Sequence, residues 1–113
     1  MIFSTLLCND VNIVIDNLGR LPVITQHPMD MTINLVNDNT NVSLTCEADG
    51  ASSYNWERQN DVIPSDSTGV NTNTLTLINL QPEDAGNYRC VATNASGSSF
   101  SNYARITING TVT

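Results

Sequence analysis

The sequence predicts an all-β fold built from short strands, and three observations support that prediction. Apolar and polar residues alternate in several short segments, as they do in strands with one buried face. Clusters of Asn, Asp, Gly, Pro and Ser separate these segments at spacings typical of a sandwich or a barrel. No window shows the apolar repeat of an amphipathic helix, and Asn, which favours turns over helices, occupies 16 of the 113 positions.

The alternating segments give the order of the strands. An edge strand is expected over residues 23–27, because Pro22 and Pro28 bracket it and a sheet edge tolerates the missing N–H of proline. Further strands are expected over residues 42–46, 74–77, 88–92 and 104–108.

The length of the chain fits one domain, for which we expect residues 21–110. Residues 1–20 are interpreted as an N-terminal extension or linker at a fragment boundary, and residues 111–113 as a C-terminal tail. The apolar start of the chain lacks basic residues and is interrupted by Asn9 and Asp10, so it is a poor secretory signal. Cys8 lies in the extension, where a free thiol, a bond between two chains and a partner in missing sequence are the alternatives.

The spacing of four residues is the most specific feature of the chain. Cys46 and Cys90 lie in two predicted strands 44 positions apart, Trp56 follows the first by ten residues, and Tyr88 precedes the second by two. Residues 80–90 read Leu-Gln-Pro-Glu-Asp-Ala-Gly-Asn-Tyr-Arg-Cys. This pattern resembles the immunoglobulin superfamily over about residues 21–109. The two prolines near the start and residues 91–97 are similar to its intermediate set, the I-set.

The resemblance implies a two-sheet antiparallel immunoglobulin-like β-sandwich with Greek-key connections. It implies a disulfide between Cys46 and Cys90 with Trp56 packed on it, and a Tyr88 hydroxyl directed at the backbone near Asp84. Two reduced thiols in a cytosolic module are the alternative. Alternation along the strands places a further set of side chains in the core: Val42, Leu44, Tyr54, Leu75, Leu77, Ala92, Ala104, Ile106 and Ile108.

One departure from the family pattern concerns Asp84. Many such domains carry a basic residue before the strand at residues 74–77 that pairs with this aspartate, and no basic residue lies between Arg58 and Leu75. We therefore expect Asp84 to accept a hydrogen bond from a nearby backbone N–H. In the same region, a turn at residues 60–61 could lead into a short strand at residues 62–63.

Three Asn-x-Ser/Thr sequons are candidates for N-glycosylation: Asn41, Asn94 and Asn109. An Asn-rich chain produces such matches by chance, so their placement matters. Asn41 is expected to point outward from its strand, where a sugar would cover part of one sheet, and Asn94 is expected at a turn. Asn109 lies near the end of the domain.

The composition excludes several classes of function. Eleven acidic and four basic residues give a net charge of −7, which argues against nucleic acid and against anionic membrane surfaces as partners. No stretch is long and apolar enough to insert into a membrane. The only histidine, His27, is expected on an exposed edge, and Glu83 and Asp84 belong to the corner before Tyr88. We therefore expect no catalytic residues, no metal site, no cofactor and no enzyme activity, although the parent protein could carry a kinase elsewhere.

A protein-binding module remains. The expected contact face is the sheet that contains the strand at Tyr54 and Trp56 and the strands over residues 88–92 and 104–108, because a glycan at Asn41 would lie on the opposite sheet. Its outward candidates are Glu57, Arg89, Tyr103 and Arg105. The resemblance implies an extracellular module of a membrane-anchored receptor, such as a receptor tyrosine kinase, or of an adhesion molecule. Its partner would be a protein ligand or another cell-surface protein, and a homodimer is compatible with this. The alternative is a structural module of an intracellular muscle-type giant protein.

Overall fold

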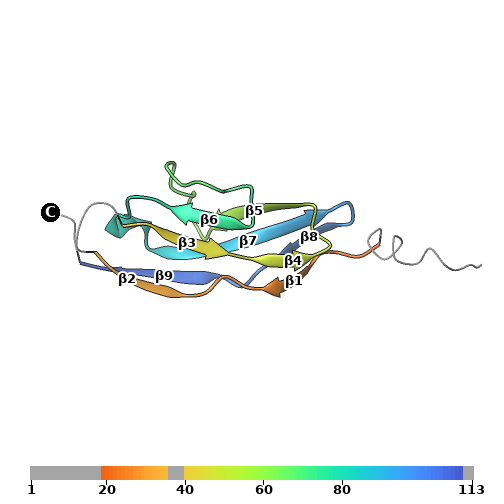
Figure 1. Ribbon diagram of the computed structural model, residues 1–113, viewed down its shortest axis with the longest axis horizontal. Coiled ribbons are helices and arrows are strands. Elements are labelled where there is room, and N and C mark those ends of the chain that lie inside the picture. Colours follow the sequence, from red (N-terminus) through yellow and green to blue (C-terminus); the bar gives the residue numbers. More distant parts are fainter. Residues whose placement is uncertain (1–18, 36–39, 111–113) are drawn as a thin grey trace, which may run out of the picture.

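The computed structural model describes residues 19–35 and 40–110, and Cys8 lies outside these ranges. The strands run along the long axis of the domain in two layers (Figure 1). The described elements are β1 (Val23–Gln26), β2 (Met31–Asn34), β3 (Val42–Thr45), β4 (Glu47–Asp49), β5 (Ser53–Arg58), β6 (Thr74–Leu77), the 3-10 turn η1 (Pro82–Asp84), β7 (Gly86–Asn94), β8 (Gly97–Phe100) and β9 (Ala104–Asn109).

The first layer contains β1, β3, β4 and β6. Strand β1 pairs with β4, and β3 pairs with β6, both antiparallel. Only Cys46 separates β3 from β4, and its backbone N–H donates to the carbonyl of Asn73, 2.9 Å away, so the two strands form one interrupted line along the layer.

The second layer has the order β2-β9-β7-β5, with β8 also paired to β7. The chain passes from β4 in the first layer to β5 in the second, returns at β6, and crosses again at β7. These crossings agree with a Greek-key arrangement and confirm the predicted β-sandwich. One pair was not anticipated: β2 runs parallel to β9, with Met31 opposite Ile106, whereas the other strand pairs are antiparallel.

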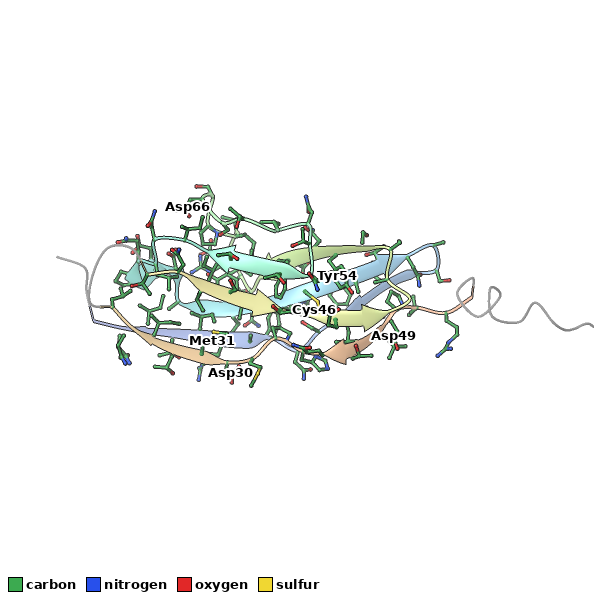
Figure 2. The ribbon with its side chains drawn as sticks, in the orientation of Figure 1. Asp30, Met31, Cys46, Asp49, Tyr54 and Asp66 are labelled. Carbon is green, nitrogen blue, oxygen red and sulfur yellow. A yellow bond between two sulfur atoms is a disulfide. The ribbon has the colours of Figure 1, made fainter. Side chains whose placement is uncertain are left out.

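The edge of the sandwich is divided between the layers. The expected edge strand is present as β1, but alternation in residues 31–34 continues into a second strand, β2, which joins the other layer. Met31 is partly buried and packs against the core, whereas the neighbouring Asp30 is exposed at this edge (Figure 2). Residues 27–30, which we call the crossover, connect β1 to β2, and two hydrogen bonds join them to the second layer. Nδ1 of His27 accepts one from the backbone N–H of Asn102 (2.9 Å). Oδ1 of Asp30 accepts the other from the backbone N–H of Arg105 (2.8 Å).

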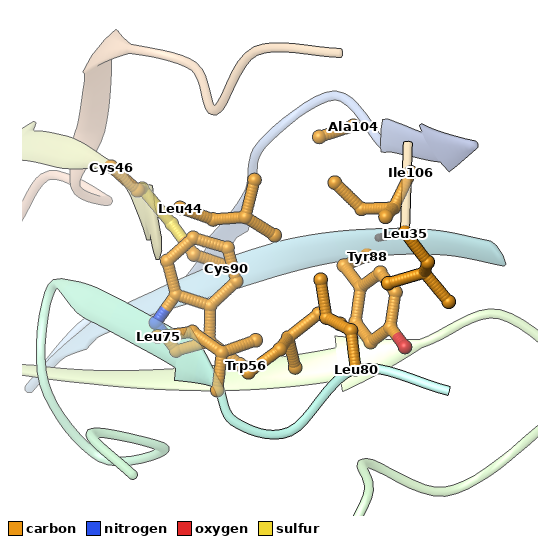
Figure 3. Close-up of a cluster of buried hydrophobic side chains, with 11 residues drawn as sticks. Leu35, Leu44, Cys46, Trp56, Leu75, Leu80, Tyr88, Cys90, Ala104 and Ile106 are labelled. Atoms are coloured by element: carbon orange, nitrogen blue, oxygen red, sulfur yellow. A yellow bond between two sulfur atoms is a disulfide. The ribbon is translucent and has the colours of Figure 1, made fainter. Parts of the chain in front are cut away.

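The core lies between the two layers (Figure 3). Removing a leucine or isoleucine side chain completely from water contributes about 1.5–3 kcal/mol, so this cluster supplies most of the driving force for packing the layers. Val42, Tyr54 and Ile108 pack against the core as expected, but they are only partly buried because they lie near strand ends, where the layers cover them incompletely. The buried cluster consists of Leu35, Leu44, Cys46, Trp56, Leu75, Leu77, Leu80, Tyr88, Cys90, Ala104 and Ile106.

The segment between β5 and β6 is a loop, and the short strand expected at residues 62–63 does not form. Only an isolated bridge between Arg58 and Asp61 follows β5, and Val62 remains 75% exposed. A second isolated bridge joins Thr68 to Thr76. The loop returns to β6 through Gly69, whose φ of +78° favours glycine and whose added Cβ would collide with the backbone oxygen of Thr74.

Candidate protein-binding face

A covalent bond joins the two layers behind the candidate face. A disulfide joins Cys46 and Cys90, whose Cα atoms are 6.5 Å apart. The indole of Trp56 lies beside the disulfide in Figure 3, and its Nε1 donates a 2.8 Å hydrogen bond to the carbonyl of Thr72. This is the arrangement of cysteines and tryptophan that the family resemblance implied, and it fixes β7 firmly against the first layer.

A tyrosine closes the corner between β6 and β7. The Tyr88 hydroxyl donates a 2.6 Å hydrogen bond to the carbonyl of Asp84, as the resemblance implied. Burial raises the pKa of Tyr88 to about 12, although the nearby positive charge of Arg58 opposes the shift. The Asp84 carboxylate accepts a 2.9 Å hydrogen bond from the backbone N–H of Gln81, which is the backbone partner expected for it.

Arg58, at the end of β5, brings a positive charge to the corner that contains Asp84. Its guanidinium donates hydrogen bonds to the carbonyls of Glu83 and Ala85, and it lies 5.5 Å from the centre of the Tyr88 ring. It also forms an ion pair with Asp61, with 3.4 Å between Nη1 and Oδ2. Sequence reasoning missed this role because the corner lies 25 or more positions further along the chain.

The outward face of the second layer carries a cluster that we call the aromatic–arginine patch, formed by Glu57, Arg89, Phe100 and Tyr103. The register places Glu57 of β5 opposite Arg89 of β7, and the nearest ion-pair atoms, Nη2 and Oε1, are 3.0 Å apart. The Arg89 guanidinium carbon lies 4.3 Å from the Phe100 ring centre and 4.7 Å from that of Tyr103. One arginine is therefore held by a carboxylate and two aromatic rings.

The patch is accessible on the described part of the chain. Phe100 is 49% exposed and Tyr103 is 36% exposed. Exposed apolar side chains that lie together are typical of protein interaction sites. Glu57 and Tyr103 also line an open depression of about 570 Å³ beside the loop at residues 59–63. Sequence reasoning named three members of the patch and missed Phe100, because no strand was expected over β8; the polar residues Ser98 and Ser99 before it hid its alternation.

Arg105 lies at the border of the patch, two residues after Tyr103. It is exposed on β9, opposite Asn87 of β7 in the register. With Asn87 it lines a second open depression, of about 520 Å³, at the start of β7. The structure therefore joins Glu57, Arg89 and Tyr103 through contacts at Arg89, and Arg105 lies one repeat further along the same face.

The opposite layer presents a different surface. The hydroxyls of Ser43 and Thr76 lie 2.9 Å apart across β3 and β6, and those of Thr45 and Thr74 lie 3.3 Å apart. The charged residues in the strands of this layer are Glu47 and Asp49, while β5, β7 and β9 carry Arg58, Arg89 and Arg105. The two sheets therefore differ in chemistry, and among the residues that the structure describes only the second combines arginine with exposed aromatic rings.

The three sequon asparagines have different surroundings. Asn41 is exposed, and its Oδ1 accepts a 3.0 Å hydrogen bond from the backbone N–H of Asn79. Asn94 is half-buried at the end of β7, where its Nδ2 donates to two backbone carbonyls. Asn109 is exposed on β9, and its Nδ2 donates a 3.2 Å hydrogen bond to Oδ1 of Asn34.

Groups that could support catalysis or bind a metal are dispersed. Within residues 19–35 and 40–110, no three His, Cys, Asp or Glu side chains gather into a potential metal site. His27 uses Nδ1 to hold the crossover, and Asp84 uses its carboxylate to hold the corner. The same part of the chain contains no helix of sufficient length and apolar character to cross a membrane.

The two layers, the disulfide between them and the tyrosine at the corner define an immunoglobulin-type domain. The family model described as "Immunoglobulin domain" matches residues 22–94, and the chain belongs to this family.

The chain is similar to segments of much longer relatives. It is 35% identical over 92 residues to human Protein sidekick-1, an alignment that covers 74% of this chain and 4% of that protein. Over 81 residues it is 32% identical to Lachesin of Drosophila melanogaster, covering 69% of this chain and 22% of Lachesin.

A solved structure shows the same fold. The N-terminal Ig1-2 module of the Drosophila receptor protein tyrosine phosphatase DLAR superposes with a TM-score of 0.67 at 25% identity, covering 81% of this chain and 47% of that one. The chain thus corresponds to a single domain within these larger proteins.

Proposed function

We propose that this domain is a non-catalytic, extracellular protein-binding module of a cell-surface receptor or an adhesion protein, anchored to the membrane by another part of its parent protein. The observation that carries the proposal is the aromatic–arginine patch, because it places two half-exposed rings around one ordered guanidinium. The disulfide supports an oxidising compartment, since such bonds form and persist mainly outside the cytosol. The similarity to a receptor, DLAR, supports the cell surface.

The geometry of the patch suits protein recognition. Tyrosine and arginine are enriched among residues that dominate binding energy at interfaces. Arg89 is already positioned by Glu57 and by both rings, so it loses little side-chain freedom when a partner docks. Its charge is partly compensated by Glu57, which lowers the cost of removing it from water.

A double substitution tests the patch directly. Phe100→Ala combined with Tyr103→Ala removes both rings and should weaken binding to cells that display the partner by at least about tenfold. Flow cytometry with the tetramerised chain measures that binding, and analytical ultracentrifugation measures self-association, which would identify a second copy as the partner. Met29→Ala is the matched control, because Met29 is 70% exposed and lies at the crossover, outside the patch. Equal binding by the double variant and the control would reject the patch.

The compartment has its own test. We expect the mature chain from secretory expression to show the mass of one internal disulfide, measured before and after reduction. Cys46 and Cys90 recovered as free thiols after secretion, with no attached sugar, would instead favour the intracellular structural module. A separate Arg105→Ala variant reports whether the second depression contributes to binding.

A further inference from the structure

Asn94 lies where three segments of the domain meet, far apart in sequence. Its Nδ2 donates a 2.8 Å hydrogen bond to the carbonyl of Arg20, before β1, and a 3.0 Å bond to the carbonyl of Gly50, after β4. Its Oδ1 accepts a 2.7 Å bond from the backbone N–H of Ser96. All three bonds come from one half-buried side chain at the end of β7.

Neighbouring contacts reinforce the same junction. The Ser99 hydroxyl donates a 2.6 Å hydrogen bond to the carbonyl of Pro22. A Cβ on Gly97 would lie 2.8 Å from Cδ2 of Leu21, so the absence of a side chain there lets the entering chain pack directly on the hairpin. The segment that leads into β1 is therefore fixed to the hairpin of β7 and β8 by several contacts, and Asn94 forms its polar centre.

N-glycosylation would alter the Asn94 contacts chemically. A glycosyl pyrophosphate donor supplies the sugar: its anomeric carbon bonds to Nδ2 as the C–O bond to the pyrophosphate breaks, and one amide hydrogen leaves as a proton. Both hydrogens of Asn94 are donated to carbonyls. One carbonyl would lose its partner, and the sugar would need room in a half-buried junction. Asn41 differs: among the described residues it uses only Oδ1, so its Nδ2 can carry a sugar without breaking a bond seen there. Asn109 is intermediate, with one hydrogen donated to Asn34.

From these differences we propose that the Asn94 side chain holds the segment before β1 against the β7–β8 hairpin, a role that we call the clasp, and that it is not a glycan acceptor in the folded protein. Asn41 carries the N-glycan of this domain. The sugar then covers the hydroxyl-bearing surface of β3 and β6, whereas the end of the sandwich formed by the β7–β8 hairpin stays free of sugar. This inference rests on the proposed extracellular setting only for the sugar; the clasp itself is independent of it.

Two aspartate variants separate the clasp from the sugar. In chain made in an oxidising host that does not glycosylate, Asn94→Asp removes both donated bonds and places a carboxylate against two carbonyls. Asn41→Asp is the matched control, because it keeps the oxygen that accepts from Asn79. We expect the melting temperature of Asn94→Asp to fall by about 5–10 °C, or the variant not to fold, while Asn41→Asp shifts by less than about 2 °C. Equal melting temperatures for the two variants would overturn the clasp.

Glycopeptide mass spectrometry of the secreted, folded chain tests the acceptor. We expect sugar at Asn41 and none at Asn94, and Ser96→Ala, which removes the second sequon but keeps the Asn94 amide, should leave the total sugar mass unchanged. A folded fraction largely glycosylated at Asn94, or lacking sugar at Asn41 while another sequon is occupied, would overturn the assignment. A chain that carries no sugar at any sequon would overturn the Asn41 assignment, while the disulfide mass would still test the extracellular proposal and the melting comparison would still decide the clasp.

Discussion

The guanidinium of Arg58 lies 5.5 Å from the ring centre of Tyr88, and the two side chains bind the same corner. Tyr88 donates a hydrogen bond to the carbonyl of Asp84, while Arg58 donates to the carbonyls of Glu83 and Ala85. Three successive carbonyls of the corner are therefore satisfied by side chains. The corner sets where β7 begins, and β7 carries both Cys90 and Arg89 of the binding face.

Removing the Tyr88 hydroxyl should destabilise the domain. Tyr88→Phe keeps the ring in the core but leaves the Asp84 carbonyl without this donor, so we expect a loss of about 1–3 kcal/mol in the free energy of unfolding. Urea denaturation followed by tryptophan fluorescence measures it. Tyr103→Phe is the control on an exposed ring and should change stability by less than about 0.5 kcal/mol. Equal stability of the two variants would contradict the role of the corner.

The same hydroxyl predicts how stability depends on alkaline pH. The pKa of Tyr88 is raised to about 12 in the folded protein because of burial, against 10.0 for a free tyrosine. Between these values the unfolded chain has lost the proton and the folded chain still holds it, so stability is full below pH 10 and falls as pH rises towards 12. Denaturation midpoints between pH 8 and pH 12 should decline more for the unsubstituted chain than for Tyr88→Phe. Parallel declines would reject this linkage.

Arg58 should contribute more to stability than an exposed arginine does. Arg58→Met keeps much of the apolar stem but removes the donors to two carbonyls, and we expect a cost of about 2–3 kcal/mol in the free energy of unfolding. Arg105→Met removes an exposed arginine from the same sheet and serves as the comparison, with an expected change within about 0.5 kcal/mol. Both are measured by urea denaturation, and a larger effect at Arg105 would refute the assignment.

Breaking the bond between the layers should have the largest effect. Replacing Cys46 and Cys90 together by Ala and Val opens a loop with a sequence separation of 44 residues, and we expect a loss of about 2–5 kcal/mol. Thermal melting of the variant, and of the unsubstituted chain with and without reductant, measures the loss. Reductant should lower the melting temperature of the unsubstituted chain and leave that of the variant unchanged. A reductant effect on both would point to another cause.

The core and the binding face differ in how far the sequence could predict them. Alternation assigned Leu44, Leu75, Leu77 and Ile106 to the interior, and all four are buried. It also placed Glu57 and Arg89 on one outward face, where they pair. It did not place Phe100 beside Arg89, because that contact depends on the register between β7 and β8, which a pattern with period two leaves open.

The sequence by itself determined the short-strand all-β character, and its resemblance to the immunoglobulin superfamily implied the two layers, the cysteine pair and the tyrosine of the corner. It could do so because burial imposes a period on residues close together in the chain, and because the spacing of Cys46, Trp56, Tyr88 and Cys90 is specific. Only the tertiary structure decided that Arg58 supports the corner and that Asn94 binds the entering segment. Those bonds join residues 25 to 74 positions apart, and no local pattern records a partner at such distance.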